Sequence, residues 1–338
     1  MRIEVVDPTG LGLGLAIGLL GLGHDVRSRR AERRRARGEL DRMADELVHR
    51  CFGGELRASV TSDLLVCVDV FADHLDSLLR GMHVGPPVPV TDPLQDDAGA
   101  LVYPHRLRYW LERAQAADRV AVVDMSDHAG PREVAFEALP NARLFAREAP
   151  AQAGGRWRPL PFLYNAVVLW LEYTRPPREW WFLPERRRHD WDWAFCGTVD
   201  HPRYGGARRR VLETLDGLWP GSRGIVQSGI PFAEVMGLWQ AARCGVDLPG
   251  QGALCFRLHE CLAVGTPLWR PVPSRVALPD GLLPVVFADP RDLPAADPDE
   301  VRAVYLEHYA PRAAAERLLD GLQYPISRAT SMAAAASR

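Results

Sequence analysis

Residues 246–268, VDLPGQGALCFRLHECLAVGTPL, decide the fold class that this sequence predicts. They begin as a short apolar strand, pass through a loop that contains Gly250 and Gly252, and continue as a helix over 254–264. Glycines between a strand and a helix let backbone N–H groups approach a ligand closely, and a helix N-terminus attracts an anion. The stretch therefore predicts one strand–loop–helix unit of a parallel α/β sheet with an anion-binding loop.

The helix of this stretch has a polar face and an apolar face. Arg257 and Glu260 lie three residues apart and share one side of the helix. An arginine can hold a diphosphate by bidentate hydrogen bonds, and a glutamate one turn further can accept from ribose hydroxyls. The apolar stripe, which we expect to face the sheet, consists of Leu254, Leu258, Cys261 and Leu262. The order of the polar groups suits a nucleoside diphosphate, and the same spacing also fits an Arg–Glu surface pair.

Short apolar segments alternate with helical patterns on both sides of this stretch. The expected strands are 2–7, 25–27, 63–68 and 119–125 in the first half, and 193–199, 223–227, 244–248, 266–270 and 283–287 in the second. The expected helices are 11–22, 71–79, 104–117, 207–218, 231–242 and 297–322. Continuously apolar strands that alternate with helices indicate parallel sheets covered on both faces. We therefore expect an α/β fold of two Rossmann-like domains that face a cleft.

The 338 residues are enough for two domains, each with its own core. We place the first domain at 1–165 and a connection rich in Pro, Arg and Trp at 166–190. The second domain then spans 191–325 and ends in a helix that returns to the first, and 326–338 forms a frayed tail.

Composition excludes several classes of function. The net charge is −2, so there is no overall electrostatic case for a nucleic-acid partner. All 41 basic residues are Arg, which excludes Schiff-base chemistry and a P-loop lysine. The six cysteines form no CxxC pair, so neither a zinc site nor a disulfide framework is expected. The oligomeric state is not indicated by the sequence.

Targeting signals and membrane segments are not expected either. The longest apolar run, 10–23, is too short for a membrane span and lacks the flanks of a signal peptide. The arginine-rich stretch 27–37 is compatible with weak peripheral contact with anionic lipid, and a solvated helix face explains it as well. We expect a soluble, cytoplasmic protein.

The segment CFRLHECLAVGTPL resembles the donor-binding helix of two-domain glycosyltransferases of the GT-B type. Their pattern, Glu-x-hydrophobic-Ala-x-Gly-x-Pro, is matched by Glu260, Ala263, Gly265 and Pro267. The preceding Phe-Arg-Leu looks most like the exostosin-like and spore-maturation branch. Residues 195–198, 246–250 and 305–309 are similar to further motifs of that branch in the same order, so the resemblance covers 191–322.

This resemblance implies a transferase that uses a nucleotide-diphosphate sugar as donor, with an acceptor on the first domain and no other cofactor. Glu260 would bind the ribose, and Arg257 the diphosphate together with the Gly250 and Gly252 loop. Gly197 and Thr198 would lie on the cleft floor. Many retaining members place an Arg/Lys pair on the phosphates. Without lysine the second cation must be an arginine, for which Arg203, Arg208 and Arg223 are the candidates.

A glycine-rich turn near the N-terminus offers a competing interpretation. Gly12, Gly14 and Gly18 approach a dinucleotide fingerprint, although the third glycine comes one residue late. The nearby arginines 27, 29 and 30 would suit the 2′-phosphate of NADP in an oxidoreductase. GT-B enzymes also open with such a turn, and Asp7, Gly12 and Gly14 would then face the acceptor. The α/β pattern of the second half favours the glycosyltransferase, and a non-catalytic nucleotide-sugar-binding protein is the third hypothesis.

The candidate catalytic base is Asp127 or His128, because both follow the expected strand at 119–125. Asp127 could equally cap the next helix, and a retaining enzyme needs no such base because the donor phosphate can take the proton. Asp190 and Asp192 resemble the metal-binding DxD of a different glycosyltransferase fold. GT-B enzymes stabilise the leaving diphosphate with arginines and helix dipoles, so no metal is expected.

Overall fold

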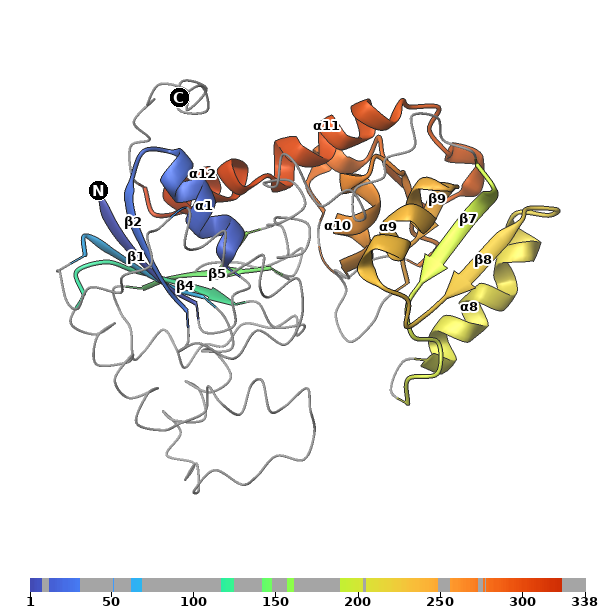
Figure 1. Cartoon of the computed structure of the whole chain (residues 1–338), viewed down its shortest axis with the longest axis horizontal. Coiled ribbons are helices and arrows are strands. Elements are labelled where there is room, and N and C mark those ends of the chain that lie inside the picture. The colour runs from blue at the N-terminus through green and yellow to red at the C-terminus, as the bar shows by residue number, and fades with distance from the viewer. Residues whose placement is uncertain are drawn as a thin grey trace. The chain divides into compact units, whose positions relative to one another are not determined.

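The computed structural model describes residues 1–7, 12–30, 51, 62–68, 117–124, 142–147, 157–160, 189–202, 205–248, 256–272, 276 and 278–323. The chain divides into two compact units. The first unit contains strands β1 to β6 with helices α1 and α12, and the second contains β7 to β11 with α8 to α11 (Figure 1). Each unit is built around a parallel sheet, so the predicted α/β class with two Rossmann-like sheets is confirmed.

The sheet of the first unit has six described strands, all paired in parallel, in the order β2-β1-β3-β4-β5-β6. Its strands are β1 (Arg2–Asp7), β2 (Asp25–Arg30), β3 (Leu64–Val68), β4 (Val120–Asp124), β5 (Ala142–Ala146) and β6 (Trp157–Pro159). Every residue of β3 and β4 is buried, which explains why these strands carry apolar side chains on both faces. Strands β5 and β6 were not predicted, because arginines interrupt their apolar pattern.

The sheet of the second unit has five described parallel strands in the order β11-β10-β9-β7-β8. Its strands are β7 (Trp191–Cys196), β8 (Gly224–Gln227), β9 (Ala242–Val246), β10 (Leu268–Trp269) and β11 (Val286–Phe287). Its helices are α8 (Gly205–Leu218), α9 (Phe232–Gln240), α10 (Phe256–Ala263) and α11 (Pro298–Tyr309), with two short 3-10 helices at Asp280–Leu282 and Pro290–Asp292. Each of these strands was predicted within a few residues.

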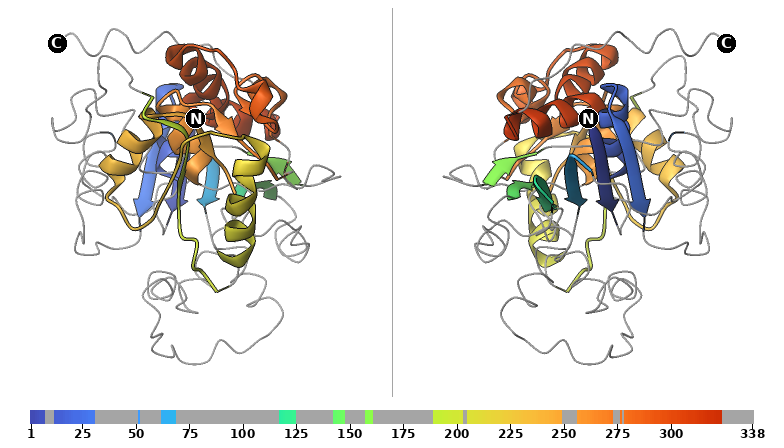
Figure 2. Two further views of the ribbon diagram at one scale, coloured as in Figure 1. Left: turned by 90° about the vertical axis from the view of Figure 1, so that its right-hand side faces the viewer. Right: turned by 90° about the vertical axis from the view of Figure 1, so that its left-hand side faces the viewer.

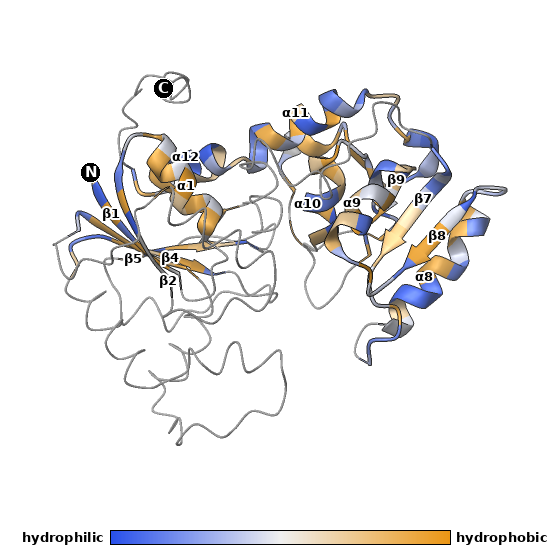
Figure 3. Cartoon of the chain, viewed as in Figure 1, coloured by the Kyte–Doolittle hydropathy of each residue, from blue (hydrophilic) through white to orange (hydrophobic). Residues whose placement is uncertain are grey.

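Helices cover both faces of the second sheet. Alternate residues of β7 and β9, including Trp193 and Phe195, pack with Leu215 of α8 on one face. On the other face α10 lies close to β9, because a Cβ on Gly245 would come within 2.3 Å of Cys261 Sγ. Figure 3 shows that α8 carries hydrophilic residues along its length, as expected for a helix with one face in solvent.

One long helix was expected over 297–322, and this prediction was wrong. The structure has two helices, α11 and α12 (Pro311–Gly321), that meet at Ala310. Pro311 cannot donate a backbone hydrogen bond, and it keeps Ala310 in an extended conformation with ψ near 150°. At the start of α11, Asp297 Oδ1 accepts from the N–H of Asp299 at 2.8 Å, as a capping aspartate does.

Helix α12 belongs to the first unit and packs against α1 (Leu13–Gly21). The close approach depends on Gly18, because a Cβ there would lie 1.9 Å from the carbonyl oxygen of Pro311. Ala314, Ala315, Leu318 and Leu319 of α12 are all buried in the core that α1 shares with the sheet. Figure 2 shows the two helices side by side over the strands of this unit.

Several predictions fall outside the described residues. These are the helices expected at 71–79 and 104–117, most of the connection at 166–190 and the tail at 326–338. Among the helices that the structure describes, none combines the length and the apolar character needed to span a lipid bilayer.

Candidate functional site

The strand order of the second sheet defines where a ligand should bind. The chain runs from β7 outward to β8, and then crosses back to β9 and continues in the opposite direction through β10 to β11. Open parallel sheets bind ligands at such a reversal, beyond the carboxyl ends of the two strands that flank it. In this unit those strands are β7 and β9, so the candidate site comprises the residues that follow them.

The segment after β7 lies at the edge of this site. Gly197 N–H donates to the carbonyl of Gln227 at 2.8 Å, which fixes the end of β7 beside the end of β8. A Cβ on Gly197 would lie 2.7 Å from Arg257 Nη1, so glycine permits the arginine to pass close to the backbone. Cys196 and Gly197 are partly exposed and Thr198 is exposed, so solvent reaches this edge of the sheet.

Arg257 projects from the first turn of α10 into the site. Its guanidinium donates to the carbonyl oxygens of Cys196, at 3.4 Å, and of Leu248, which lie at the ends of the two switch-point strands. The same group lies over the Phe195 ring, 4.9 Å from its centroid. Only 7% of Arg257 is exposed. The predicted phosphate-binding arginine is therefore held at the reversal of strand order.

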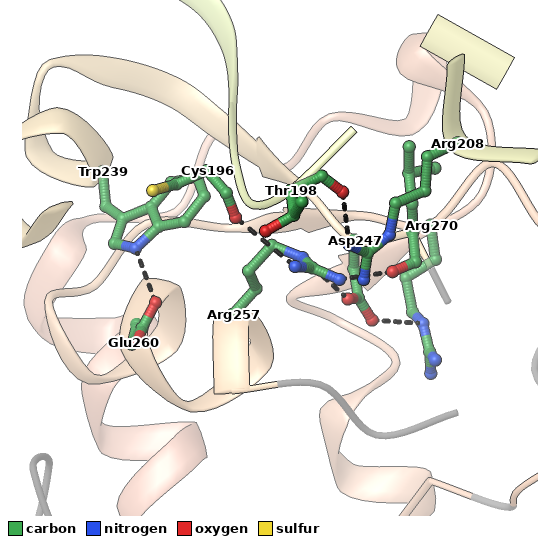
Figure 4. A network of polar contacts seen from close by, with 9 residues as sticks. Cys196, Thr198, Arg208, Trp239, Asp247, Arg257, Glu260 and Arg270 are labelled. Atoms are coloured by element: carbon green, nitrogen blue, oxygen red, sulfur yellow. Dashed lines mark hydrogen bonds and ion pairs between the residues drawn. The ribbon is translucent and has the colours of Figure 1, made fainter. Parts of the chain in front are cut away.

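Two further arginines and one aspartate complete this cluster (Figure 4). Asp247 follows β9 and is almost fully buried; its Oδ2 is 3.1 Å from Nε of Arg270, and its Oδ1 is 3.6 Å from Nε of Arg257. Arg208 of α8 donates to the carbonyl of Thr198 at 2.8 Å and lies 5.7 Å from the centroid of the Phe195 ring. Three buried guanidinium groups thus meet at one edge of the sheet, which is a suitable environment for a phosphate group.

Asp247 and Arg270 were not predicted as site residues. Both directly follow segments that were predicted as strands, and a charged residue at the carboxyl end of a parallel strand was the signal that could have identified them. Of the three arginines proposed as a second cation, Arg208 lies in the cluster.

Glu260 lies one turn beyond Arg257 on α10, and its Oε2 accepts from the indole N–H of Trp239 at 3.2 Å. Only 8% of Glu260 is exposed. Its neighbours in the motif have structural roles: Gly265 adopts φ +78° in the turn that ends the helix, and Thr266 donates its hydroxyl to the carbonyl of Trp239 at 2.8 Å. These contacts fix the start of β10. Among the motif residues Glu260, Ala263, Gly265 and Pro267, only Glu260 has an ionisable side chain.

The thiol of Cys196 is not suited to nucleophilic chemistry. The pKa of this thiol is raised to about 11, mainly by burial and also by the nearby carboxylate of Glu260, while Arg257 partly opposes the shift. A thiol with this pKa is protonated at neutral pH, and the thiolate is the reactive form. We therefore assign no covalent role to Cys196.

A buried aromatic cluster anchors α10 to α11. His259 Nδ1 and the hydroxyl of Tyr305 are 2.9 Å apart, and the His259 ring meets the Tyr309 ring edge-on at 5.1 Å between centroids. The rings of Tyr305 and Tyr309 stack on each other. This packing fixes the rotation of α10 about its axis, and with it the directions in which Arg257 and Glu260 project.

Arg223 does not lie in the site, which corrects its assignment as a donor-binding residue. It precedes β8 and is exposed at the amino end of the sheet, whereas the arginine cluster lies at the carboxyl ends. Its backbone N–H donates to Asp192 Oδ2 at 2.9 Å, and Asp192 also pairs with Arg243 at 3.3 Å. Arg223 and Asp192 therefore hold the amino ends of β8 and β7 together.

The same contacts predict a small, pH-dependent effect of Asp192→Asn. The hydrogen bond from the Arg223 N–H is the main cause that lowers the pKa of Asp192 below its usual value, and Arg243 lowers it too, although burial opposes both. The pKa of Asp192 in the folded protein is lower than 3.8, the ordinary value for an aspartate. The stabilisation is therefore complete above pH 3.8 and is lost as the pH falls through the folded-state pKa. We expect Asp192→Asn to cost less than about 1 kcal/mol at pH 7.

Urea unfolding at pH 7 and pH 3 measures this difference, which should shrink at the lower pH. Stabilisation of the wild type by Mn²⁺ that is lost in Asp192→Asn would instead support a metal site at the DxD sequence. Among the residues that the structure describes, no group of three or more His, Cys, Asp or Glu is arranged to hold a metal ion.

The N-terminal glycines have packing roles in the first unit. Gly12 is the residue before α1, and a Cβ there would lie 2.8 Å from Cγ2 of Val68. Gly14 is buried in the first turn of α1, and Gly18 is covered by α12. Asp7 is the last residue of β1. Close packing therefore accounts for Gly12 and Gly18, the first and third glycines of the apparent dinucleotide motif.

Other predicted site residues lie outside the part of the chain that the structure describes. They are Asp127 and His128, proposed as the base, Gly250 and Gly252 of the loop before α10, and Arg203. Their roles remain predictions.

The fold and the site together define a protein of two parallel α/β units, with a buried arginine cluster at the switch point of the second sheet. No protein-family model and no curated protein matches the sequence.

Solved structures with detectable similarity include an alpha-glucosyltransferase in complex with UDP and a 13-mer DNA that contains an HMU base. It is 12% identical over 96% of this chain and 100% of that chain, with a TM-score of 0.43. A second is S. aureus MnaA with UDP, which is 10% identical over 96% of each chain and has a TM-score of 0.35. A third is an O-GlcNAc transferase from Thermobaculum terrenum, which is 14% identical over 96% of this chain and 64% of that chain and has a TM-score of 0.39.

Proposed function

We propose that the second unit binds a nucleotide-diphosphate sugar and that the protein transfers its sugar to an acceptor without a metal ion. One observation carries the proposal: Arg257 and Glu260, one turn apart on α10, both lie at the switch point of a parallel sheet, where two more buried arginines meet. This arrangement supports the role that the GT-B resemblance implies for the two residues. A structural Arg–Glu surface pair would not be buried in this way.

The chemistry follows from where charge develops. Transfer breaks the bond between the anomeric carbon and the phosphate oxygen and forms a bond from that carbon to an acceptor hydroxyl. Negative charge then grows on the leaving diphosphate, and preorganised guanidinium groups stabilise it most strongly where water is excluded. Arg257 is held by two main-chain carbonyls and therefore needs little reorganisation during the reaction.

The remaining parts of the reaction are proposed from the sequence. The acceptor hydroxyl must lose its proton, either to Asp127 or His128 in an inverting reaction or to the donor phosphate in a retaining one. The first unit would hold the acceptor, and a small or natural-product acceptor is our proposal.

A thermal-shift panel with UDP, GDP, TDP, CMP, NADH and NADPH tests the proposal on the wild type, Glu260→Ala and Glu213→Ala. Glu213 is an exposed glutamate of α8 and serves as the matched control. We expect one nucleoside diphosphate to stabilise the wild type and Glu213→Ala, with about tenfold weaker binding in Glu260→Ala after loss of the ribose hydrogen bonds.

Two other outcomes would contradict the proposal. A shift with NADPH alone, unchanged in Glu260→Ala, would move the site to the N-terminal glycine turn. Nucleotide-sugar binding without transfer to any acceptor in a broad set would identify a binding protein that is not an enzyme.

A further inference from the structure

Arg270 and Asp247 form a buried ion pair to which the sequence motifs assign no role. Arg270 directly follows β10, and Asp247 directly follows β9, the neighbouring strand. Exposure of Arg270 is 7% and that of Asp247 is 2%. Burial of a guanidinium and a carboxylate has a large desolvation cost, so such a pair is weak evidence for stability alone. The position of this pair at the switch point points to a functional reason for keeping it.

The two oxygens of Asp247 are shared between two arginines. Oδ2 lies 3.1 Å from Arg270 Nε, and Oδ1 lies 3.6 Å from Arg257 Nε. Both guanidinium groups lie close to the same carboxylate and therefore close to each other. Without that carboxylate, the two positive charges would repel each other in a low dielectric. Asp247 therefore holds a pair of positive groups together within reach of one small anion.

The site residues also have an order across the sheet edge. In Figure 4, Glu260 with Trp239 lies to one side of Arg257, and Asp247 with Arg270 lies to the other. If Glu260 binds the ribose and Arg257 the diphosphate, the groups on the far side of Arg257 face the phosphate that is distal to the nucleoside. Arg208 lies on this side too, but its Nη1 donates to the carbonyl of Thr198 at 2.8 Å and so holds the segment after β7.

We propose that Arg270 is the second phosphate-binding cation of this site, and that Asp247 is a positioning residue that holds Arg257 and Arg270 ready for a diphosphate. This inference rests on the proposed function, and it names the residue that would hold the second phosphate group. It makes the site selective for two linked phosphates over one, because each arginine is directed at a different part of the anion.

Calorimetric titration with inorganic pyrophosphate and with inorganic phosphate tests the proposal without a nucleobase. The variants are Arg270→Gln, Arg270→Lys and, as the control, Arg243→Gln, which changes an exposed arginine of the same sheet that pairs with Asp192. We expect Arg270→Gln to weaken pyrophosphate binding at least tenfold, which corresponds to about 1.4 kcal/mol, and phosphate binding less than threefold. Arg270→Lys should restore part of the loss, and Arg243→Gln should bind both anions like the wild type.

Asp247→Asn separates positioning from simple electrostatics. The substitution makes the site more positive, so electrostatics alone predicts tighter binding of pyrophosphate. Positioning predicts weaker binding, because Arg257 and Arg270 lose their common anchor. It also predicts that pyrophosphate raises the melting temperature of a destabilised Asp247→Asn variant, since the anion replaces the missing charge between the two guanidinium groups.

The outcomes keep this inference apart from the proposed function. The inference is overturned if Arg270→Gln keeps the wild-type preference for pyrophosphate over phosphate, or if Asp247→Asn binds pyrophosphate more tightly. This holds even if nucleotides bind to the wild type and Glu260→Ala abolishes their binding. Selective loss of pyrophosphate binding in Arg270→Gln supports the inference even if no nucleotide in the panel binds, in which case the proposed sugar-nucleotide specificity is the part that fails.

Discussion

Arg257→Gln is expected to weaken binding of the nucleoside diphosphate by about 100-fold or more. A bidentate guanidinium makes two charge-assisted hydrogen bonds, each worth about 1.5–3 kcal/mol when the partner is charged. Glutamine keeps much of the length of the side chain but neither the charge nor the second donor pair. Isothermal titration with the nucleotide identified in the thermal-shift panel measures the change. Arg257→Lys should recover only part of the lost affinity, because lysine lacks the planar pair of N–H donors of the guanidinium group.

A purely structural role for Arg257 makes a different prediction. The residue donates to the carbonyls of Cys196 and Leu248, so its loss should lower stability whether or not it binds a ligand. Arg243→Gln controls for the removal of an arginine from this sheet. If Arg257→Gln lowers the melting temperature yet retains the wild-type dissociation constant for the nucleotide, the assignment of Arg257 to phosphate binding is wrong.

Gly18→Ala is expected to lower the melting temperature of the first unit by about 6–12 °C. The added methyl carbon would stand 1.9 Å from the carbonyl oxygen of Pro311, and a backbone atom cannot move aside as a flexible side chain can. Separating α1 from α12 would cost about 3 kcal/mol, and a domain of this size loses about 2–4 °C for each kcal/mol. Differential scanning calorimetry measures the shift.

Gly21→Ala in the same helix is the matched control. Gly21 is exposed at the end of α1, and a Cβ there would meet no atom within 4 Å. Alanine at an unobstructed helical position is neutral or stabilising, because it reduces the conformational freedom of the unfolded chain. Equal melting temperatures for Gly18→Ala and Gly21→Ala would show that the packing of α12 on α1 contributes little to stability.

The strands were the most predictable part of this fold. Residues 64–68 and 120–123 are apolar throughout, as expected for short strands that are buried on both faces between helices. Strands β5 and β6 escaped prediction because Arg143 and Arg158 are exposed there and break the apolar pattern. The break between α11 and α12 could have been read from Pro311, since a proline rarely lies inside a helix.

The candidate site was predictable only in part, for a physical reason. Arg257 and Glu260 were identified because both lie on one helix, where a local spacing of three residues determines which face they share. Arg270 follows a different strand from Asp247, and their contact depends on the register between β9 and β10. No local pattern encodes that register.

The sequence by itself determined the α/β class, most element positions and the two polar residues of α10, because periodicity, capping and spacing are local properties of the chain. Only the tertiary structure decided which arginine joins Arg257: it brought Arg270 and Arg208 to the carboxyl edge of the second sheet and left Arg223 at the opposite edge. The reason is the order and direction of the parallel strands. Parallel strands bring together residues that are more than sixty positions apart in the sequence, such as Cys196 and Arg257. They also separate residues at opposite ends of one strand by the length of that strand, even when these residues are close in the sequence.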